Sequence, residues 1–524
     1  MTTTATDRID VDVAIVGSGF AGAFTALILH QLGRRVVMIE RGRHPRFAIG
    51  ESTTPLTNLL IEQIADRYDL PQIRALSKWG TWQRTRPDIA CGLKRGFSFM
   101  FHALGEPFTD DASHARQLLV AASPNDDVSD THWYRPDFDH ALVREAQSAG
   151  ALYFDETTLE SADDTGDTMT LTGRRHGRPI VFTAGFVIDA SGPRGFLNRI
   201  LGSGAAPLRW LPPTQGLYTH FEKVGLWNDL QPSEGRLPYL PDDAALHHVF
   251  PGGWIWILRF NNGITSAGAA LTDPLAEAIG ASDGAPAWDR LMALLPSVRE
   301  QFRESRPTMP FIHSPRVAFR CHEVVGEKWA LLPSAAGVID PLLSTGFPLT
   351  LLGITRLMDV LATTTPGPAR QAALAAYERT TQDEQDITEQ LVGGLYASMA
   401  DPECFKRLSL LYFAAASYSE TVRRLNKPHL APGFLLCDHP HFGQELRACA
   451  ALAAAQPTGA DRTALFERID MAIEPFDTAG LLDRSRRDWY PVLAEDLIGS
   501  ASKLDASAED VHHLLARCGF VARG

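Results

Sequence analysis

Hydrophobic and polar positions at the start of the chain follow a strand, helix, strand pattern. Residues 10–16 form a short run rich in β-branched residues and followed by glycine, as in a buried parallel strand. Residues 20–32 place apolar side chains at helical spacing and stop at Gly33. Residues 36–39 form a second apolar run that ends at Glu40. This spacing predicts a βαβ unit, whose crossover is right-handed in nearly all proteins.

The remaining pattern divides the chain into a mixed region and a helical region. Prolines separate short apolar runs between about 205 and 320, which is typical of a mixed sheet. The chain beyond Pro366 is rich in alanine and predicts helices to its end, with breaks near Pro402, Pro428, Pro457 and Phe476. Further predicted elements are helices over 138–149 and 348–361 and strands over 153–155, 181–189, 247–250, 254–260 and 329–332.

A glycine-rich turn joins the first strand to the first helix. Residues 17–22, Gly-Ser-Gly-Phe-Ala-Gly, fit the GxGxxG pattern. The first glycine of that pattern makes the tight turn, the second lets the backbone approach a pyrophosphate, and the third lets helix and strand pack closely. The helix N-terminus presents free N–H groups to the phosphates, and Glu40 lies where an acid can accept the ribose hydroxyls. A turn without a ligand would also fit six residues alone, but the surrounding elements predict a dinucleotide site.

Two later segments favour FAD over NAD. Residues 187–192 resemble the second flavin-binding turn of glutathione-reductase-type flavoproteins, and residues 335–341 resemble the third, which lies along the flavin ribityl chain. Pro333 and Ser334 stand where the third segment usually has glycine and aspartate, although Ser334 can still hydrogen-bond the ribityl chain. Because no second GxGxxG is present, we expect no nicotinamide domain.

Four further segments occur in order over most of the first 365 residues. They are His44–Pro55, which contains Gly-Glu-Ser-Thr; Leu93–His102, which contains Lys94 and an aromatic run; Gly253–Ile257, with two tryptophans; and Asp340–Gly346. Together they resemble the flavin-dependent halogenases, especially the natural-product branch that includes the tetracycline halogenases. In that family the segments correspond to a strap over the flavin, the region of a lysine, a paired-tryptophan motif and a halide site beside the flavin.

The resemblance implies a fold and a set of site residues. The fold would be α/β, with a glutathione-reductase-type Rossmann FAD-binding domain, an inserted mixed β-sheet for the substrate and a C-terminal helical region. Residues 1–365 would form the FAD-binding module, with the sheet inserted at about 205–320, and residues 366–524 would cover the substrate site. The expected cofactor-binding residues are Gly17, Gly19, Phe20, Ala21, Gly22, Glu40, Arg41, Gly50, Glu51, Ser52, Asp189, Ser334, Gly346 and Phe347. Lys94 would be catalytic, Thr345 and Gly346 would bind halide, and Trp254 and Trp256 would lie on the substrate side.

This chemistry needs an anion site and a donor. Reduced flavin and oxygen can oxidise chloride or bromide to hypohalous acid, so the halide must lie beside the flavin without its water. Backbone N–H groups of Thr345 and Gly346, at the start of a predicted helix, can hold an anion through the helix dipole. A Lys94 ammonium partly buried in the aromatic run 97–101 can direct the acid by a hydrogen bond, or form a haloamine if desolvation lowers its pKa.

Each assignment has a structural alternative. Lys94 can be an ordinary strand-edge lysine, since most lysines are solvated. Lys78 competes for the same role, but it lacks the aromatic run, and we interpret it as a surface residue. Trp254 and Trp256 point the same way along a strand and can be core aromatics.

Some positions depart from the family pattern. Leu258 and Arg259 stand where the tryptophan motif usually ends in isoleucine-proline. Leu343 occupies the site where free-tryptophan halogenases carry a glutamate, so we expect poor activity on free tryptophan.

Composition excludes several classes of protein. The net charge of -13 argues against a nucleic-acid partner, which needs a basic footprint. None of the six cysteines lies at CxxC spacing, so we expect reduced thiols in a cytoplasm. We expect no signal peptide and no membrane span, because glycines and polar residues interrupt the apolar stretch 11–32. His247 and His248 are adjacent and would face opposite sides of a strand, so we assign no metal.

The residues and the resemblance together predict a cytoplasmic enzyme of secondary metabolism, such as antibiotic biosynthesis. It would be an FAD-dependent halogenase that takes reduced flavin from a separate reductase and halogenates an electron-rich aromatic natural product, free or bound to a carrier protein. The alternatives are an FAD-dependent aromatic monooxygenase, a geranylgeranyl-reductase-type flavin enzyme and a non-catalytic flavoprotein. Lys94 and the tryptophan pair favour the halogenase over the monooxygenase.

Overall fold

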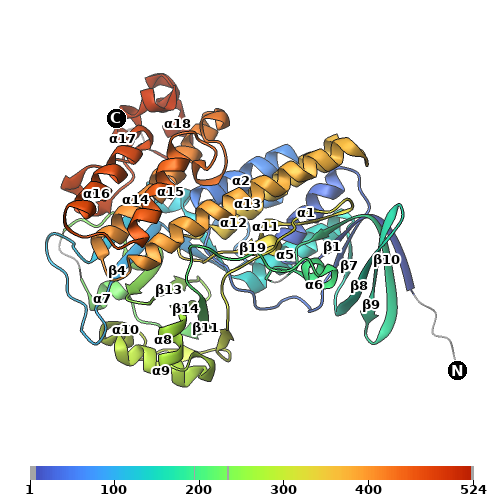
Figure 1. Cartoon of the computed structure of the whole chain (residues 1–524), viewed down its shortest axis with the longest axis horizontal. Helices are drawn as coiled ribbons and strands as arrows, with labels where there is room; N and C mark the ends of the chain where they lie inside the picture. The colour runs from blue at the N-terminus through green and yellow to red at the C-terminus, as the bar shows by residue number, and fades with distance from the viewer. Residues whose placement is uncertain (1–6, 194, 233–234, 521–524) are drawn as a thin grey trace.

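Two large β-sheets and a group of C-terminal helices make up the fold (Figure 1). The computed structural model describes residues 7–193, 195–232 and 235–520. In Figure 1 the first sheet lies to the right, and the second lies at the lower left, below the C-terminal helices.

The first sheet contains the predicted βαβ unit. Its strands are β7 (Leu152–Phe154), β2 (Val36–Ile39), β1 (Asp7–Val16), β10 (Arg178–Asp189), β9 (Thr168–Arg175) and β8 (Thr157–Thr165) in that order, with β18 (Trp329–Leu331) beside the end of β10. β1 runs parallel to both β2 and β10, and α1 (Phe20–Gln31) crosses from β1 to β2. The central strands are fully or largely buried, which explains why the sequence shows them as continuous apolar runs.

Helices pack around this sheet and join it to the rest of the molecule. α1 contacts α5 (Arg135–Ala149) and α12 (Gly346–Thr363), and α12 also contacts α2 (Pro55–Arg67). In the described part of the chain, α12 is the one helix long and apolar enough to cross a membrane. Its contacts with α1, α2 and α13 (Pro368–Ala397) are those of a helix in a protein core, where the same composition is needed.

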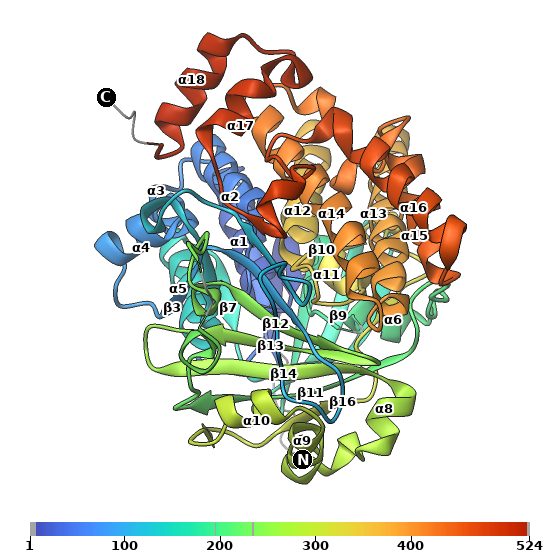
Figure 2. The same ribbon diagram turned by 90° about the vertical axis from the view of Figure 1, so that its left-hand side faces the viewer.

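The second sheet is wider than the interval 205–320. Its strands are β15 (Arg306–Pro307), β11 (Thr214–Glu222), β14 (Ile264–Thr272), β13 (Gly253–Arg259), β12 (Ala245–Phe250), β4 (Gly96–Phe101), β5 (Gln117–Ala121) and β20 (Trp489–Tyr490), with β16 (Ile312–Ser314) also on β11. The helices α8 (Asp273–Ala278), α9 (Ala285–Leu294) and α10 (Pro296–Gln301) lie at the outer side of this sheet (Figure 2). Strands from the aromatic run and from the C-terminal region therefore join the sheet that we expected to be one insertion.

The C-terminal region is mainly helical, as predicted, but not entirely. Its main helices are α13 (Pro368–Ala397), α14 (Pro402–Arg424), α15 (Phe442–Ala454), α16 (Gly459–Ile473), α17 (Ala494–Gly499) and α18 (Ala508–Arg517). The breaks fall where the prolines predicted them. The expectation of helices to the end of the chain was wrong at β20, which pairs in parallel with β5. Two residues of sheet pairing are too short to leave a periodic signal in the sequence.

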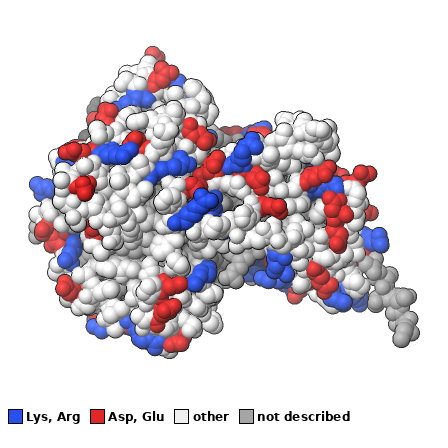
Figure 3. Space-filling model, in the orientation of Figure 1, with Lys and Arg blue, Asp and Glu red and all other residues white. Residues whose placement is uncertain are grey.

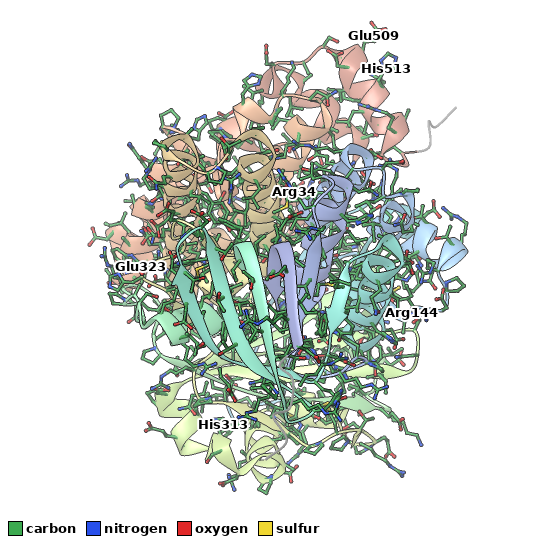
Figure 4. The ribbon with its side chains drawn as sticks, turned by 90° about the vertical axis from the view of Figure 1, so that its right-hand side faces the viewer. Arg34, Arg144, His313, Glu323, Glu509 and His513 are labelled. Atoms are coloured by element: carbon green, nitrogen blue, oxygen red, sulfur yellow. The ribbon has the colours of Figure 1, made fainter. Side chains whose placement is uncertain are left out.

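The surface carries both signs of charge. In Figure 3 basic and acidic side chains are interspersed over the visible face. Figure 4 looks onto the side that carries the first sheet, where exposed Arg34 follows α1 and exposed Arg144 lies on α5. All six cysteines are free thiols, as expected.

Candidate active site

Two glycines in the turn between β1 and α1 lie where no side chain would fit. Gly17 has a φ of +97°, and a Cβ there would lie 2.6 Å from the Ala190 carbonyl oxygen. A Cβ on Gly22 would lie 2.1 Å from the Gly17 carbonyl oxygen. These are the tight turn and the close helix–strand contact that a dinucleotide fold requires.

Charged groups gather over the middle glycine of the turn. Gly19 is the N-cap of α1, and a Cβ there would lie 3.5 Å from a guanidinium nitrogen of Arg135, 3.8 Å from one of Arg46 and 3.5 Å from a carboxylate oxygen of Asp139, which pairs with Arg135. The free N–H groups of a helix start and two guanidinium groups fit a pyrophosphate. Arg135 was not singled out in the sequence, because it lies more than a hundred residues from the turn.

Glu40 lies at the end of β2, where the fingerprint predicts an acid. It accepts hydrogen bonds from the Ser18 amide (3.2 Å), the Ser18 hydroxyl (3.0 Å) and the Gly42 amide (2.8 Å), and it pairs with Arg46 at 3.0 Å. Burial by itself would raise the pKa of Glu40, but Arg46 and these hydrogen bonds hold it below its usual value. The carboxylate is therefore ionised and can accept hydroxyl groups. Arg41 is exposed beside it.

The strap crosses from β2 toward α2. Arg135 donates to the Gly50 carbonyl oxygen at 2.7 Å and holds the strap against α5. Glu51 is buried and pairs with His220 at 2.9 Å through one oxygen. Its other oxygen and the Ser52 hydroxyl have no partner among the described residues. Buried polar atoms without partners are rare in proteins, so these two atoms indicate a place where a polar ligand lies.

The other expected flavin-binding residues lie on α1, on α12, at the end of β10 and on a short helix after β18. Phe20, at the start of α1, packs edge to face against Phe347, at the start of α12, with ring centroids 4.9 Å apart. Asp189 is fully buried and shapes its own turn through the Ser191 amide (2.9 Å) and the Leu197 amide (2.7 Å), and burial raises its pKa. Ser334 lies in the short helix α11 (Pro333–Ala336). Together these groups fit FAD: a glycine cradle for its phosphates, an acid for a ribose, and unpaired polar atoms along the strap.

The segment before α12 has the geometry of an anion site. Ser344 has a left-handed φ of +53°, and α12 begins directly after Thr345. In the described chain the backbone N–H groups of Thr345, Gly346 and Phe347 have no hydrogen-bond acceptor. A Cβ on Gly346 would meet open space. Free amides at the positive end of a helix beside open space can bind a halide.

Lys94 is fully buried at the end of β3 (Cys91–Lys94). Its Nζ donates to the Thr53 carbonyl oxygen of the strap and lies 3.8 Å from the centroid of the Phe97 ring. Burial lowers the pKa of Lys94 to about 7, against the opposing influence of Asp130. The alternative of a solvated strand-edge lysine is therefore excluded.

Asp130 faces Lys94 across a two-stranded sheet. β6 (Asp130–Trp133) pairs antiparallel with β3, with Asp130 opposite Lys94 and His132 opposite Gly92. Asp130 accepts a hydrogen bond from Asn58 at 2.6 Å, and burial raises its pKa to about 8 even though Lys94 lowers it. Sequence analysis missed this carboxyl, because pairing between strands far apart in the chain has no local signal.

Lys78 is not the surface residue that we expected. Its ammonium pairs with Glu62 at 2.9 Å, and Glu62 also pairs with Arg424 at 3.2 Å. The three side chains are largely buried, because α14 packs over α2 at this point. Lys78 also lines a cavity of about 180 Å³.

This cavity lies beside Lys94. Its wall contains Phe97, whose ring Lys94 contacts, and Thr54, which follows the Thr53 carbonyl that Lys94 bonds. The C-terminal region supplies much of the rest, including Tyr412, Phe413, Glu420, Arg424, Leu497 and Leu514. The wall is thus mainly apolar and aromatic, with three charged residues, Lys78, Glu420 and Arg424, among its members.

The two tryptophans of β13 point the same way, with ring centroids 5.7 Å apart. The Trp254 indole donates to the Tyr396 hydroxyl at 3.1 Å, and the Trp256 indole donates to Ser266 at 3.3 Å. Both tryptophans are buried, and neither lines the cavity.

The histidine pairs do not form a metal site. His247 stacks on Phe99, with centroids 4.6 Å apart, whereas His248 bonds to His102 at 2.9 Å on the other face. Within the described ranges, no group of three or more His, Cys, Asp or Glu side chains is placed to hold a metal.

Comparison with known proteins identifies the class and then the family. Residues 12–339 match the family of FAD-dependent oxidoreductases, which is the class that the fold and the glycine turn define. The monodechloroaminopyrrolnitrin halogenase PrnC of Pseudomonas fluorescens is 31% identical over 400 residues, which cover 74% of this chain and 68% of PrnC. The tetracycline 7-halogenase of Kitasatospora aureofaciens is 33% identical over 353 residues, which cover 64% of this chain and 60% of that enzyme. The structure of the halogenase PltM in complex with phloroglucinol and FAD superposes with a TM-score of 0.81 at 25% identity, over 91% of this chain and 99% of PltM.

The chain belongs to the flavin-dependent halogenases. It is therefore an oxidoreductase that uses FAD and a halide, as the sequence predicts. The resemblance read from the four segments and the expected fold class are confirmed.

Proposed function

We propose that this halogenase transfers chlorine or bromine to the ring of a small electron-rich aromatic compound, and that Lys94 directs the transfer. The observation that carries the proposal is the position of Lys94. Its ammonium lies buried between the strap, through Thr53, and a wall of the cavity, through Phe97. Lys94 therefore contacts both the strap and a residue of the cavity wall.

Bound FAD, once reduced, would supply the chemistry that oxidises halide to hypohalous acid with oxygen. The free amides of Thr345 and Gly346 would hold the halide for that step. Lys94 would then hydrogen-bond the oxygen of the acid, which polarises the oxygen–halogen bond. The ring carbon takes the halogen, the leaving hydroxide takes a proton from Lys94, and the neutral amine takes the proton that the ring releases. A pKa of about 7 suits both proton transfers at neutral pH.

The size and lining of the cavity support a compact aromatic substrate. A dry apolar cavity of roughly 150 Å³ is known to hold benzene, so about 180 Å³ accommodates one substituted ring. Phe97, Tyr412 and Phe413 can pack against such a ring. The relatives' names point to aromatic substrates too, and PltM binds phloroglucinol, a single-ring phenol.

The cavity also supports the proposed division of the chain. Residues of α14, α17 and α18 lie in its wall, so the region 366–524 would cover the substrate site of the FAD-binding module 1–365. One dinucleotide turn supports a supply of reduced flavin from a separate reductase. Two more distant relatives are named as halogenases of a pyrrole on a peptidyl carrier protein, so free and carrier-bound substrates belong in the same assay.

The test incubates the enzyme, FAD and a flavin reductase with a panel of aromatic compounds in chloride, bromide and halide-free buffer. Mass spectrometry identifies the products. Phloroglucinol and related phenols are the first compounds to try. Wild type should give halogenated products only when halide is present. Lys94→Ala should keep FAD and consume oxygen but release peroxide or hypohalite instead of product.

The control is Lys503→Ala, which changes a lysine of the C-terminal region that takes no part in the cavity. Near wild-type halogenation by Lys94→Ala would refute the role of Lys94. Hydroxylated product from wild type at every halide concentration would favour the monooxygenase instead.

A further inference from the structure

Three buried side chains from separate parts of the chain form one hydrogen-bonded relay. Trp254 of β13 donates its indole N–H to the hydroxyl of Tyr396, on α13, at 3.1 Å. The Tyr396 hydroxyl donates to Asp340 at 2.9 Å. The exposed fractions of these side chains are 1%, 7% and 3%, so water does not compete for the bonds.

The relay ends on the residue that opens the candidate halide segment. One oxygen of Asp340 accepts from Tyr396, and the other accepts from the Leu342 amide at 3.0 Å. The second bond closes a tight turn around Pro341, after which Ser344 takes its left-handed conformation. The amides of Thr345 and Gly346 follow directly. The direction in which these amides point therefore depends on how Asp340 is held.

Both bonds need Asp340 to accept with both of its oxygens. Burial raises the pKa of Asp340 to about 7, while the Tyr396 hydroxyl, the Leu342 amide and the Trp254 indole favour the ionised form. These three groups are the polar partners that face the carboxyl from α13, from its own segment and from β13. Loss of the Tyr396 hydroxyl would leave a buried oxygen unpaired and the turn free to shift.

We infer that Tyr396 is a positioning residue for the halide, which orients the Thr345–Gly346 amides through Asp340 and is itself oriented by Trp254. The inference rests on the proposed halide site at Thr345 and Gly346. It gives the first tryptophan of the paired motif a task away from the cavity, which it does not line. It also links α13 of the C-terminal region to the segment beside the flavin.

The alternative is that Tyr396 only braces α13 against the core. Tyr377 provides a matched control, because it lies on the same helix, is also buried and donates its hydroxyl to the Leu331 carbonyl oxygen at 2.8 Å. Tyr396→Phe and Tyr377→Phe each remove one buried hydrogen bond and keep the ring. A bracing role predicts the same effect from both.

The experiment measures chloride binding to the FAD-loaded enzyme by ³⁵Cl NMR line broadening, together with KM for chloride and kcat at saturating chloride. We expect Tyr396→Phe to weaken chloride binding and raise KM about tenfold, with kcat changed less than about threefold. Trp254→Phe should weaken binding in the same direction but less, and Tyr377→Phe should not. Unchanged chloride binding in Tyr396→Phe, or equal losses in both tyrosine variants, would overturn the inference.

A separate variant tests the halide site itself. Gly346→Ala adds a methyl group in open space, which the fold tolerates. If Gly346→Ala binds chloride as well as wild type does, the proposed site is wrong whatever Tyr396 does. If Gly346→Ala weakens chloride binding and Tyr396→Phe does not, the halide site is supported and the positioning role of Tyr396 is refuted.

Discussion

The substitution Lys94→Met should stabilise the protein while it destroys halogenation. If Lys94 served only for packing, its replacement would destabilise the protein. A buried charge instead destabilises the fold, so its replacement by an apolar side chain of similar volume should stabilise the protein. Methionine has nearly the volume of lysine and no charge, so it fills the same space beside Phe97.

The magnitude follows from the pKa of Lys94. Burial lowers that pKa from 10.5 to about 7. At about 1.4 kcal/mol per pKa unit, the folded protein loses on the order of 5 kcal/mol by holding this group below pH 7. Methionine would leave the Thr53 carbonyl oxygen without its donor, which costs about 1–3 kcal/mol. We therefore expect a net gain of about 2–4 kcal/mol in the free energy of unfolding.

The gain should depend on pH in a defined direction. Between about pH 7 and 10.5 the unfolded chain still holds the lysine proton and the folded chain has released it, so wild-type stability from this group rises with pH. The advantage of Lys94→Met should be full below pH 7 and should shrink as pH rises toward 10.5. Asp130 adds no new charge at neutral pH, because without Lys94 its pKa lies above about 8.

Urea unfolding of wild type and Lys94→Met at pH 6 and pH 9 measures the stability, and product formation with a reductase measures the activity. Halogenated product should fall by about 10²–10⁴-fold, which is the usual contribution of a group that transfers protons. Lys503→Met is the control and should change the free energy of unfolding by less than about 0.5 kcal/mol. A loss of stability at pH 6, or a gain that grows with pH, would refute the reasoning about the buried charge.

Three further predictions follow from other parts of the site. Gly19→Val should abolish FAD binding, because the valine side chain would fill the space beside Arg135 that the pyrophosphate needs. The chain should still fold, because Gly19 has a φ of -65° that valine can adopt. Flavin absorbance of the purified protein checks this. Lys78→Ala leaves Glu62 with one cationic partner at the edge of the cavity, so KM for the aromatic substrate should rise several-fold with little change in the rate of oxygen consumption. Free tryptophan should be a poor substrate, because apolar Leu343 offers no anchor for its amine; efficient, regioselective chlorination of tryptophan would contradict this.

The sequence by itself determined the cofactor-binding half of this protein. The predicted strand 36–39 has the bounds of β2, and the predicted helix 20–32 differs from α1 by one residue. Buried parallel strands, helical spacing and obligatory glycines are local properties, so they can be recognised without a partner. The order of the motifs then identified the family, which the comparisons confirmed.

The tertiary structure alone decided what surrounds the motifs. Asp130 meets Lys94 through the pairing of two strands, and Tyr396 meets Trp254 across 142 residues. Lys78 is buried because α14 packs over α2, and not because of any residue next to it in the chain. Burial sets the pKa of a charged group and the value of a hydrogen bond, and burial at these positions comes from elements far away in the sequence. The motifs therefore name the reactive groups, while the packing of distant elements gives those groups their chemistry.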